Sequence, residues 1–294
     1  MGLVLVKQEE RENTHNSWLA RKIYAKTTLT TFQYCRERFR QRYVLRTDEA
    51  WGDDLIEGLS GHKLIETLHQ KLLKGELFYP AEVYEIFKKE MMRLEYRRAS
   101  KKNPGNWLKD SWDKIKTPYE LYEKSWKKWY TQILGVEEMW GLDEEVLLGG
   151  ARCAGHLDLR VPKLIVDFKF VGKSSQHRQP KKFDLGMEMY KKGTGVARTA
   201  ILPLVKEPFA RQPKELKPGQ VFEADYMIDG LLEVNHTKAT AQTTELIIHD
   251  MVSAIERGDL SGGPPDVGKN LCQRKYCDFW GRCKYTQHLP RKGL

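Results

Sequence analysis

Two aspartates and a lysine near the middle of the chain are the residues whose types and spacing could carry out chemistry. Asp158 lies in the run Gly-His-Leu-Asp-Leu-Arg-Val, and Asp167 and Lys169 lie in the later run Leu-Ile-Val-Asp-Phe-Lys-Phe. Carboxylate oxygens are the ligands that Mg²⁺ and Mn²⁺ prefer. A divalent ion held there can polarise a phosphoryl oxygen and activate a bound water, while the lysine offsets charge on a pentavalent transition state. The alternative is an ion pair on an exposed face of a sheet.

Two predicted strands must bring these three side chains together. Residues 155–161 and 163–170 have the composition of short strands, with a proline at the turn between them. Since side chains alternate along a strand, Asp167 and Lys169 project from one face, while their apolar neighbours form the other. The hairpin then places Asp158 on the adjacent strand, within reach of that pair.

These motifs resemble those of the PD-(D/E)XK nuclease superfamily, and of its RecB-like branch in particular. That branch typically shows Gly-x-x-Asp on one strand and Asp-x-Lys on the next, as in the two runs above. It also has a Gly-x-x-x-His motif on an earlier helix, which Gly58 and His62 match. The resemblance implies that the metal ligands are His62, Asp158, Asp167 and the backbone carbonyl of Phe168. It implies a catalytic role for Lys169, supported by Asp158 and Asp167.

The helix that follows the lysine strand carries half of another family motif. The family shows Gln-x-x-x-Tyr there, and Tyr190 lies at about the family distance from Lys169, so the resemblance implies that Tyr190 contacts the DNA backbone. The glutamine position is occupied by Gly186. On the earlier helix, Glu66 could support His62 from one turn away, and His69 is expected to be structural.

The cysteines indicate a second metal centre. Cys272, Cys277 and Cys283 lie close together near the end of the sequence, whereas Cys35 and Cys153 stand alone. Thiolates at such spacing bind zinc or an iron–sulfur cluster, and both need a fourth ligand. We expect Cys153 to be a small core residue.

The segment around Cys35 resembles the N-terminal helix of the iron–sulfur members of the RecB-like branch, which include AddB-type and CRISPR-associated exonucleases. In those proteins one early cysteine and three late ones hold a [4Fe–4S] cluster. The resemblance therefore implies a cluster on Cys35, Cys272, Cys277 and Cys283, although the first late gap is x4 here and x2 in the family. Zn²⁺ and plain buried thiols are the alternatives.

Composition points toward a polyanionic partner. The 294-residue chain carries a formal charge of +10, and such an excess favours nucleic acid as a partner through counterion release. A soluble basic protein without such a partner is the alternative. No apolar run approaches the length that spans a bilayer, and the odd number of cysteines argues against a disulfide scaffold. We expect a cytoplasmic protein with no membrane partner.

The predicted fold is α/β: a restriction-endonuclease-like mixed β-sheet flanked by helices, with a helical insertion and an Fe–S cluster joining the N- and C-terminal segments. The expected organisation is a polar leader at 1–27 and one nuclease domain at 28–294, with a helical insertion at 75–140, the catalytic sheet core at 141–206 and the cysteine tail at 259–294. Helices are expected from Thr28 or Thr30 to Arg46 and at 53–74, 81–98, 118–134, 181–192 and 237–258. Further strands are expected at 146–153 and 199–206, and a loop at 101–117. Aromatic residues interleaved with lysines near 107–130 suggest either a local core or stacked bases.

The function expected from these features is hydrolysis of DNA by a metal-dependent exonuclease that acts on single strands or DNA ends, in recombination, repair or phage DNA processing. One alternative is a CRISPR-associated or helicase-coupled subunit active only in a complex. Because the sequence has no Gly-x-x-x-x-Gly-Lys-Ser/Thr loop, a helicase or recombination partner would be a separate protein. The other alternative is an inactive DNA-binding module of the same fold.

Overall fold

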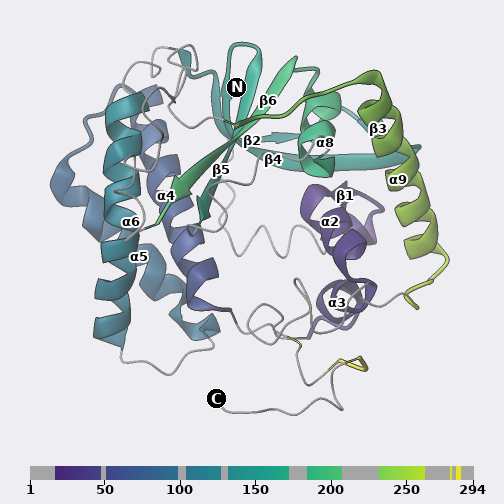
Figure 1. Ribbon diagram of the computed structural model, residues 1–294, viewed down its shortest axis with the longest axis horizontal. Helices are drawn as coiled ribbons and strands as arrows, with labels where there is room; N and C mark the ends of the chain where they lie inside the picture. Colours follow the sequence, from purple (N-terminus) through teal and green to yellow (C-terminus); the bar gives the residue numbers. More distant parts are fainter. Residues whose placement is uncertain are drawn as a thin grey trace, which may run out of the picture.

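A mixed β-sheet with helices on both faces forms the centre of the molecule (Figure 1). The computed structural model describes residues 17–47, 51–98, 104–126, 132–171, 184–206, 232–261, 279 and 283–285. The mixed sheet and the helices on its two faces confirm the predicted mixed α/β architecture. Within these residues, no helix is long and apolar enough to cross a membrane.

The sheet is built around its longest strand, β4, in the strand order β1-β4-β5-β6-β7, with β2 and β3 also paired to β4. Its strands are β1 (Tyr24–Ala25), β2 (Gly135–Trp140), β3 (Leu147–Leu148), β4 (Ala151–Val161), β5 (Leu164–Val171), β6 (Arg198–Val205) and β7 (Leu232–Glu233). The β1–β4 and β5–β6 pairs are parallel, and the other pairs are antiparallel.

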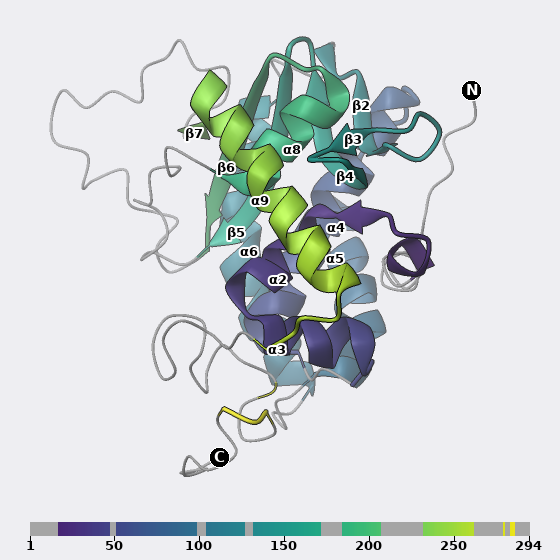
Figure 2. The ribbon, with the colours of Figure 1, turned by 90° about the vertical axis from the view of Figure 1, so that its right-hand side faces the viewer.

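Helices cover the two faces of the sheet as two groups (Figures 1 and 2). One group is α4 (Asp53–Leu73), α5 (Pro80–Leu94) and α6 (Pro104–Trp126), with a 3-10 turn at Glu95–Arg97. The other group is α2 (Lys26–Tyr34), α8 (Leu185–Thr194) and α9 (Lys238–Glu256). A short helix α3 (Arg36–Phe39) and a π-helical turn (Arg40–Val44) follow α2.

Each helical group closes a separate hydrophobic core, and β5 contributes to both. Ile165 packs with the core under α2, α8 and α9. Val166 and Phe168 pack with the core under α4 and α6. This alternation is the one predicted from the sequence, and it leaves Asp167 and Lys169 on the α2/α8 side of the sheet.

The N-terminal boundary differs from the prediction. Tyr24 and Ala25 pair in parallel with Cys153 and Ala154, so the segment predicted as a polar leader at 1–27 contributes a strand to the sheet. Helix α2 then begins at Lys26, before the threonines at which a helix start was predicted. The helix is also broken, since Cys35 has an extended backbone with φ −164°.

Two further boundaries differ within the predicted insertion at 75–140. Helix α6 begins at Pro104, so the loop predicted at 101–117 is wrong from residue 104 onward. Proline is well suited to the first turn of a helix because its missing N–H has no partner there in any case. The sheet also begins earlier than residue 141, because β2 occupies 135–140.

Outside the predicted insertion, the two strands predicted at 146–153 and 155–161 are largely one strand, β4.

Candidate active site

Asp158 and Asp167 lie where strands β4 and β5 separate. Their antiparallel pairing runs from Val161↔Leu164 to Leu159↔Val166 and stops one residue before the two aspartates. Beyond that point, Asp158 Oδ2 accepts a hydrogen bond from the backbone N–H of Phe168 at 2.8 Å. The side chain of Asp158 thus replaces a ladder bond and stays beside Asp167.

Phe168 therefore turns its backbone toward the opening between the strands. Within a strand, the N–H and C=O of one residue point to the same side. Because the N–H of Phe168 bonds Asp158, its carbonyl also faces the β4 side. The structure thus places the predicted carbonyl ligand on the same side as Asp158.

Asp167 is a buried carboxylate with a cation at each oxygen. It is 2% exposed, with Lys169 Nζ 2.5 Å from Oδ2 and Lys26 Nζ 3.0 Å from Oδ1. Burial alone would raise the pKa of Asp167, but the ammonium groups of Lys169 and Lys26 outweigh burial and hold the pKa well below its ordinary value. Asp167 is therefore ionised throughout the neutral range.

Lys169 remains protonated in the same setting. Burial would lower its pKa, but the charge of Asp167 outweighs that effect and raises the pKa above the ordinary lysine value. About half of its side chain is exposed. The ammonium group is thus a charged hydrogen-bond donor that a bound molecule can reach.

Lys26 joins this site, although its role was not predicted from the sequence. It begins α2 directly after Ala25 of β1, and its ammonium lies 4.4 Å from the centroid of the Tyr190 ring as well as beside Asp167. Lys26 and Asp167 are 141 positions apart in the chain. In the sequence, the one feature that could have pointed to Lys26 was the glycine at position 186, because Lys26 occupies the space that a side chain there would fill.

His62 reaches the site from α4. Its Nδ1 lies 3.5 Å from Asp158 Oδ2, and its ring lies edge-on to Phe168 and Phe170. The residue before it, Gly61, allows this approach, because a Cβ there would lie 2.5 Å from the Phe170 ring. The structure therefore brings His62 and Asp158 together.

Two other polar residues of α4 were given predicted roles, Glu66 and His69. Both contact residues other than the aspartates and Lys169. The Glu66 carboxylate accepts hydrogen bonds from Lys63 at 2.6 Å and Gln70 at 3.0 Å. His69 is buried, and its Nε2 is 2.8 Å from the Tyr122 hydroxyl. Burial lowers the pKa of His69 to about 3, so this histidine is neutral and structural.

Tyr190 lies inside the site rather than on an outer surface. It is 6% exposed and packs against Trp140 as well as Lys26. Burial, followed by the charges of Asp167 and Asp158, raises its pKa well above the ordinary value. Tyr190 is therefore a neutral phenol, and its ring forms a wall of the site.

The donor atoms suit Mg²⁺ or Mn²⁺ in kind. They comprise two carboxylates, one of them held ionised by its neighbours, together with an imidazole and a strand carbonyl that faces them. As the side chains stand, no three His, Cys, Asp or Glu residues are gathered for metal binding within the described part of the chain. Both oxygens of Asp167 contact lysines instead.

Two of the four predicted cluster cysteines are described, and Cys272 and Cys277 lie outside the described residues. The Sγ of Cys35 accepts a hydrogen bond from the N–H of Arg38 at 3.4 Å and so caps α3, while Cys283 is buried. Arg36 forms a 3.2 Å ion pair with Asp259. The Tyr285 hydroxyl donates to the Ser261 carbonyl at 2.9 Å, so the segments that carry the two cysteines both contact the segment that follows α9.

Cys153 differs from these two cysteines. It is fully buried in β4, and burial raises its pKa to about 12. A thiol in this state is unreactive, as expected of a core residue.

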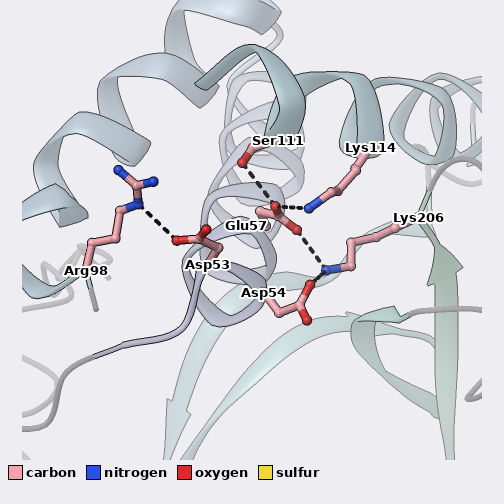
Figure 3. Close-up of polar contacts among 7 residues, drawn as sticks. All are labelled: Asp53, Asp54, Glu57, Arg98, Ser111, Lys114 and Lys206. Atoms are coloured by element: carbon pink, nitrogen blue, oxygen red, sulfur yellow. Dashed lines mark hydrogen bonds and ion pairs between the residues drawn. The ribbon is translucent and has the colours of Figure 1, made fainter. Parts of the chain in front are cut away.

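A second group of charges, the Glu57 cluster, joins helices α4 and α6 to the end of β6 (Figure 3). It consists of Asp53, Asp54, Glu57, Arg98, Ser111, Lys114 and Lys206. The fully buried Glu57 carboxylate accepts from Lys114 at 2.6 Å, Lys206 at 2.9 Å and Ser111 at 3.0 Å. Lys206 also bonds Asp54 at 2.6 Å. Because three carboxylates face three cations, we interpret this cluster as structural.

Comparison with known proteins gives one match. A family model described as the PD-(D/E)XK nuclease superfamily matches residues 25–284, a range that includes every residue placed in the site above. No curated protein and no solved structure matches the chain.

Proposed function

This chain belongs to the PD-(D/E)XK nuclease superfamily, whose members are generally metal-dependent nucleases, and we propose that it hydrolyses phosphodiester bonds in DNA. The observation that carries the proposal is the position of Asp158 beside Asp167, where their two strands part, with the Lys169 ammonium 2.5 Å from Asp167. This arrangement combines two carboxylates and a reachable cation at one point of the sheet.

In this proposal, Asp158, Asp167, His62 and the Phe168 carbonyl hold Mg²⁺ or Mn²⁺. The ion, when bound, polarises a phosphoryl oxygen and lowers the pKa of a coordinated water. The N–H of Phe168 holds the Asp158 carboxylate in place. Lys169, which remains protonated, donates a hydrogen bond to the attacking water or to a phosphate oxygen and offsets the growing negative charge.

We further propose that the enzyme is an exonuclease acting on single-stranded DNA or DNA ends. The support is the likeness of its motifs to the RecB-like branch and the formal charge of +10, which favours a polyanionic substrate. Recombination, repair and phage DNA processing all generate such ends. A separate helicase or recombination protein is the protein partner that we propose for such an enzyme.

A [4Fe–4S] cluster on Cys35, Cys272, Cys277 and Cys283 is the second part of the proposal. Its support is the contact of α3 with Asp259 and of Tyr285 with Ser261, since the two segments that carry the described cysteines both contact residues 259–261. The cluster would join the N-terminal and C-terminal segments of the chain through its cysteine ligands.

Cleavage of labelled DNA with Mn²⁺ tests the nuclease assignment. Single-stranded and duplex substrates are compared for wild type, Asp167→Ala, Lys169→Ala and the control Lys88→Ala, which removes an exposed helix lysine. We expect the first two variants to lose cleavage by at least about 100-fold and the control to cut normally. Equal cleavage by all four proteins would exclude this site, and cleavage by none would favour an inactive DNA-binding module.

A further inference from the structure

We propose that Lys26 is a second substrate-contacting lysine, which binds a non-bridging oxygen of the scissile phosphate and is positioned by the absence of a side chain at Gly186. This inference rests on the proposed nuclease function, and it assigns a residue that lies outside the Asp-Asp-Lys motif. It also gives Gly186 a role within the site.

The backbone fixes where Lys26 begins. Ala25 pairs with Ala154 of β4, four residues before Asp158, and Lys26 is the first residue of α2. Its side chain therefore starts one residue beyond a paired strand of the same sheet. From there its ammonium reaches Asp167 Oδ1 at 3.0 Å.

Gly186 provides the space through which the Lys26 side chain passes. A Cβ built on Gly186 would lie 2.2 Å from Lys26 Cε and 2.7 Å from Lys26 Cδ, which is far closer than carbon atoms approach. Gly186 lies within α8 and does not have the positive φ that favours glycine elsewhere in this chain. Its missing side chain is therefore explained by Lys26 and not by backbone conformation.

Tyr190, one helical turn after Gly186, supports the ammonium through its ring. The 4.4 Å separation between Lys26 Nζ and the ring centroid is that of a cation–π contact. Gly186, Tyr190 and Asp167 thus define the position of one charged group from three sides. About one fifth of the Lys26 side chain is exposed, and in this proposal that is the part open to a phosphate oxygen.

The charge balance of the site accounts for a second lysine. The carboxylates of Asp167, Asp184 and Asp158 all act electrostatically on Lys26, and Asp167 is also paired with Lys169. Lys26 thus offsets negative charge that an incoming phosphate group would otherwise meet.

Lys26→Met and Gly186→Ala separate this role from simple packing. Methionine keeps an unbranched stem against Gly186 and removes only the ammonium. Alanine at 186 keeps the lysine but displaces its flexible end, and it improves the helix propensity of α8. Lys22→Met is the matched control, since Lys22 is an exposed neighbour that pairs with Glu256.

The experiment measures kcat and KM for Mn²⁺-dependent cleavage of single-stranded DNA, with melting temperature as the folding control. We expect Lys26→Met to lower kcat about 100-fold, Gly186→Ala to lower it about 10-fold without a lower melting temperature, and Lys22→Met to match wild type. The double variant Lys26→Met/Gly186→Ala should be no slower than Lys26→Met, because Gly186 acts through Lys26. Lys26→Arg, which keeps the charge, should cut faster than Lys26→Met.

Each failure has a different meaning. An active wild type whose Lys26→Met variant keeps its kcat overturns the role of Lys26 and leaves the nuclease proposal intact. Additive losses in the double variant overturn the assignment of Gly186. If Lys26→Arg and Lys26→Met lose kcat to the same extent, and their melting temperatures fall equally, the lysine has a structural role. A wild type that cuts no DNA overturns both proposals.

Discussion

The carboxylate of Asp158 accepts a hydrogen bond from the backbone N–H of Phe168, at the residue where β4 and β5 stop pairing. One side chain thus does two things: it terminates the pairing of two strands, and it holds a charge beside Asp167. These two roles can be separated by substitution.

Asp158→Asn and Asp158→Ala should have different effects on stability and the same effect on cleavage. The asparagine carbonyl can still accept from Phe168, so we expect little change in the free energy of unfolding. Alanine leaves that N–H without its acceptor and should cost about 1–3 kcal/mol. Urea unfolding measures the difference, while DNA cleavage should be lost in both variants. Equal stability of the two would show that the bond to Phe168 contributes nothing.

Acid should destabilise the protein through His69. Its pKa is about 3 in the folded state, against 6.5 for an unperturbed histidine, because burial disfavours the charged ring. Between these values the unfolded chain binds more protons, so stability rises with pH, and it falls as pH drops below about 6.5. The slope is at most about 1.4 kcal/mol per pH unit.

A variant without the ring nitrogens tests this effect. The free energy of unfolding should fall by roughly 2 kcal/mol more for wild type than for His69→Phe when the pH is lowered from about 7.5 to about 5. Parallel losses in the two proteins would mean that His69 is not the group responsible.

Breaking the Glu57 cluster should cost far more than breaking an exposed ion pair. Lys206→Met leaves the fully buried Glu57 with one fewer cation, and we expect a loss of about 3–5 kcal/mol. Arg198→Ala removes the partner of Glu233 in a half-exposed pair and should cost below about 1 kcal/mol. Chemical denaturation compares them. A further change of Glu57 to Gln in the Lys206→Met protein should recover part of the loss.

The cysteine cluster is tested by colour, metal content and a cap-preserving substitution. Cys35→Ser keeps an acceptor for the N–H of Arg38, since serine is a good N-cap, but it replaces the thiolate ligand. An iron–sulfur cluster is brown, so we expect Cys35→Ser and Cys283→Ala to lose this colour and to melt at a lower temperature than wild type. Cys153→Ala should keep the colour, because that thiol is in the core. Anaerobic wild type that contains stoichiometric zinc would replace the iron–sulfur proposal, and metal-free wild type would remove it.

Local sequence determined the parts of this protein that depend on neighbours in the chain. The alternation of β5 set Asp167 and Lys169 on one face, because successive side chains of any strand point to opposite sides. The helix predicted at 53–74 is α4, which begins at Asp53, and Gly75 follows it with φ +70°. Such features need no information about distant segments.

Only the tertiary structure decided which distant segments complete the site. Strand β1 has two residues, too few for any periodicity, and it exists because β4 offers a partner at Cys153 and Ala154. That pairing carries Lys26 to Asp167, which lies 141 positions further along the chain, and into the space that Gly186 leaves open. A lysine followed by threonines looks like an ordinary solvated helix start in the sequence. Its role depends on a through-space contact between side chains, which the order of residues does not encode locally.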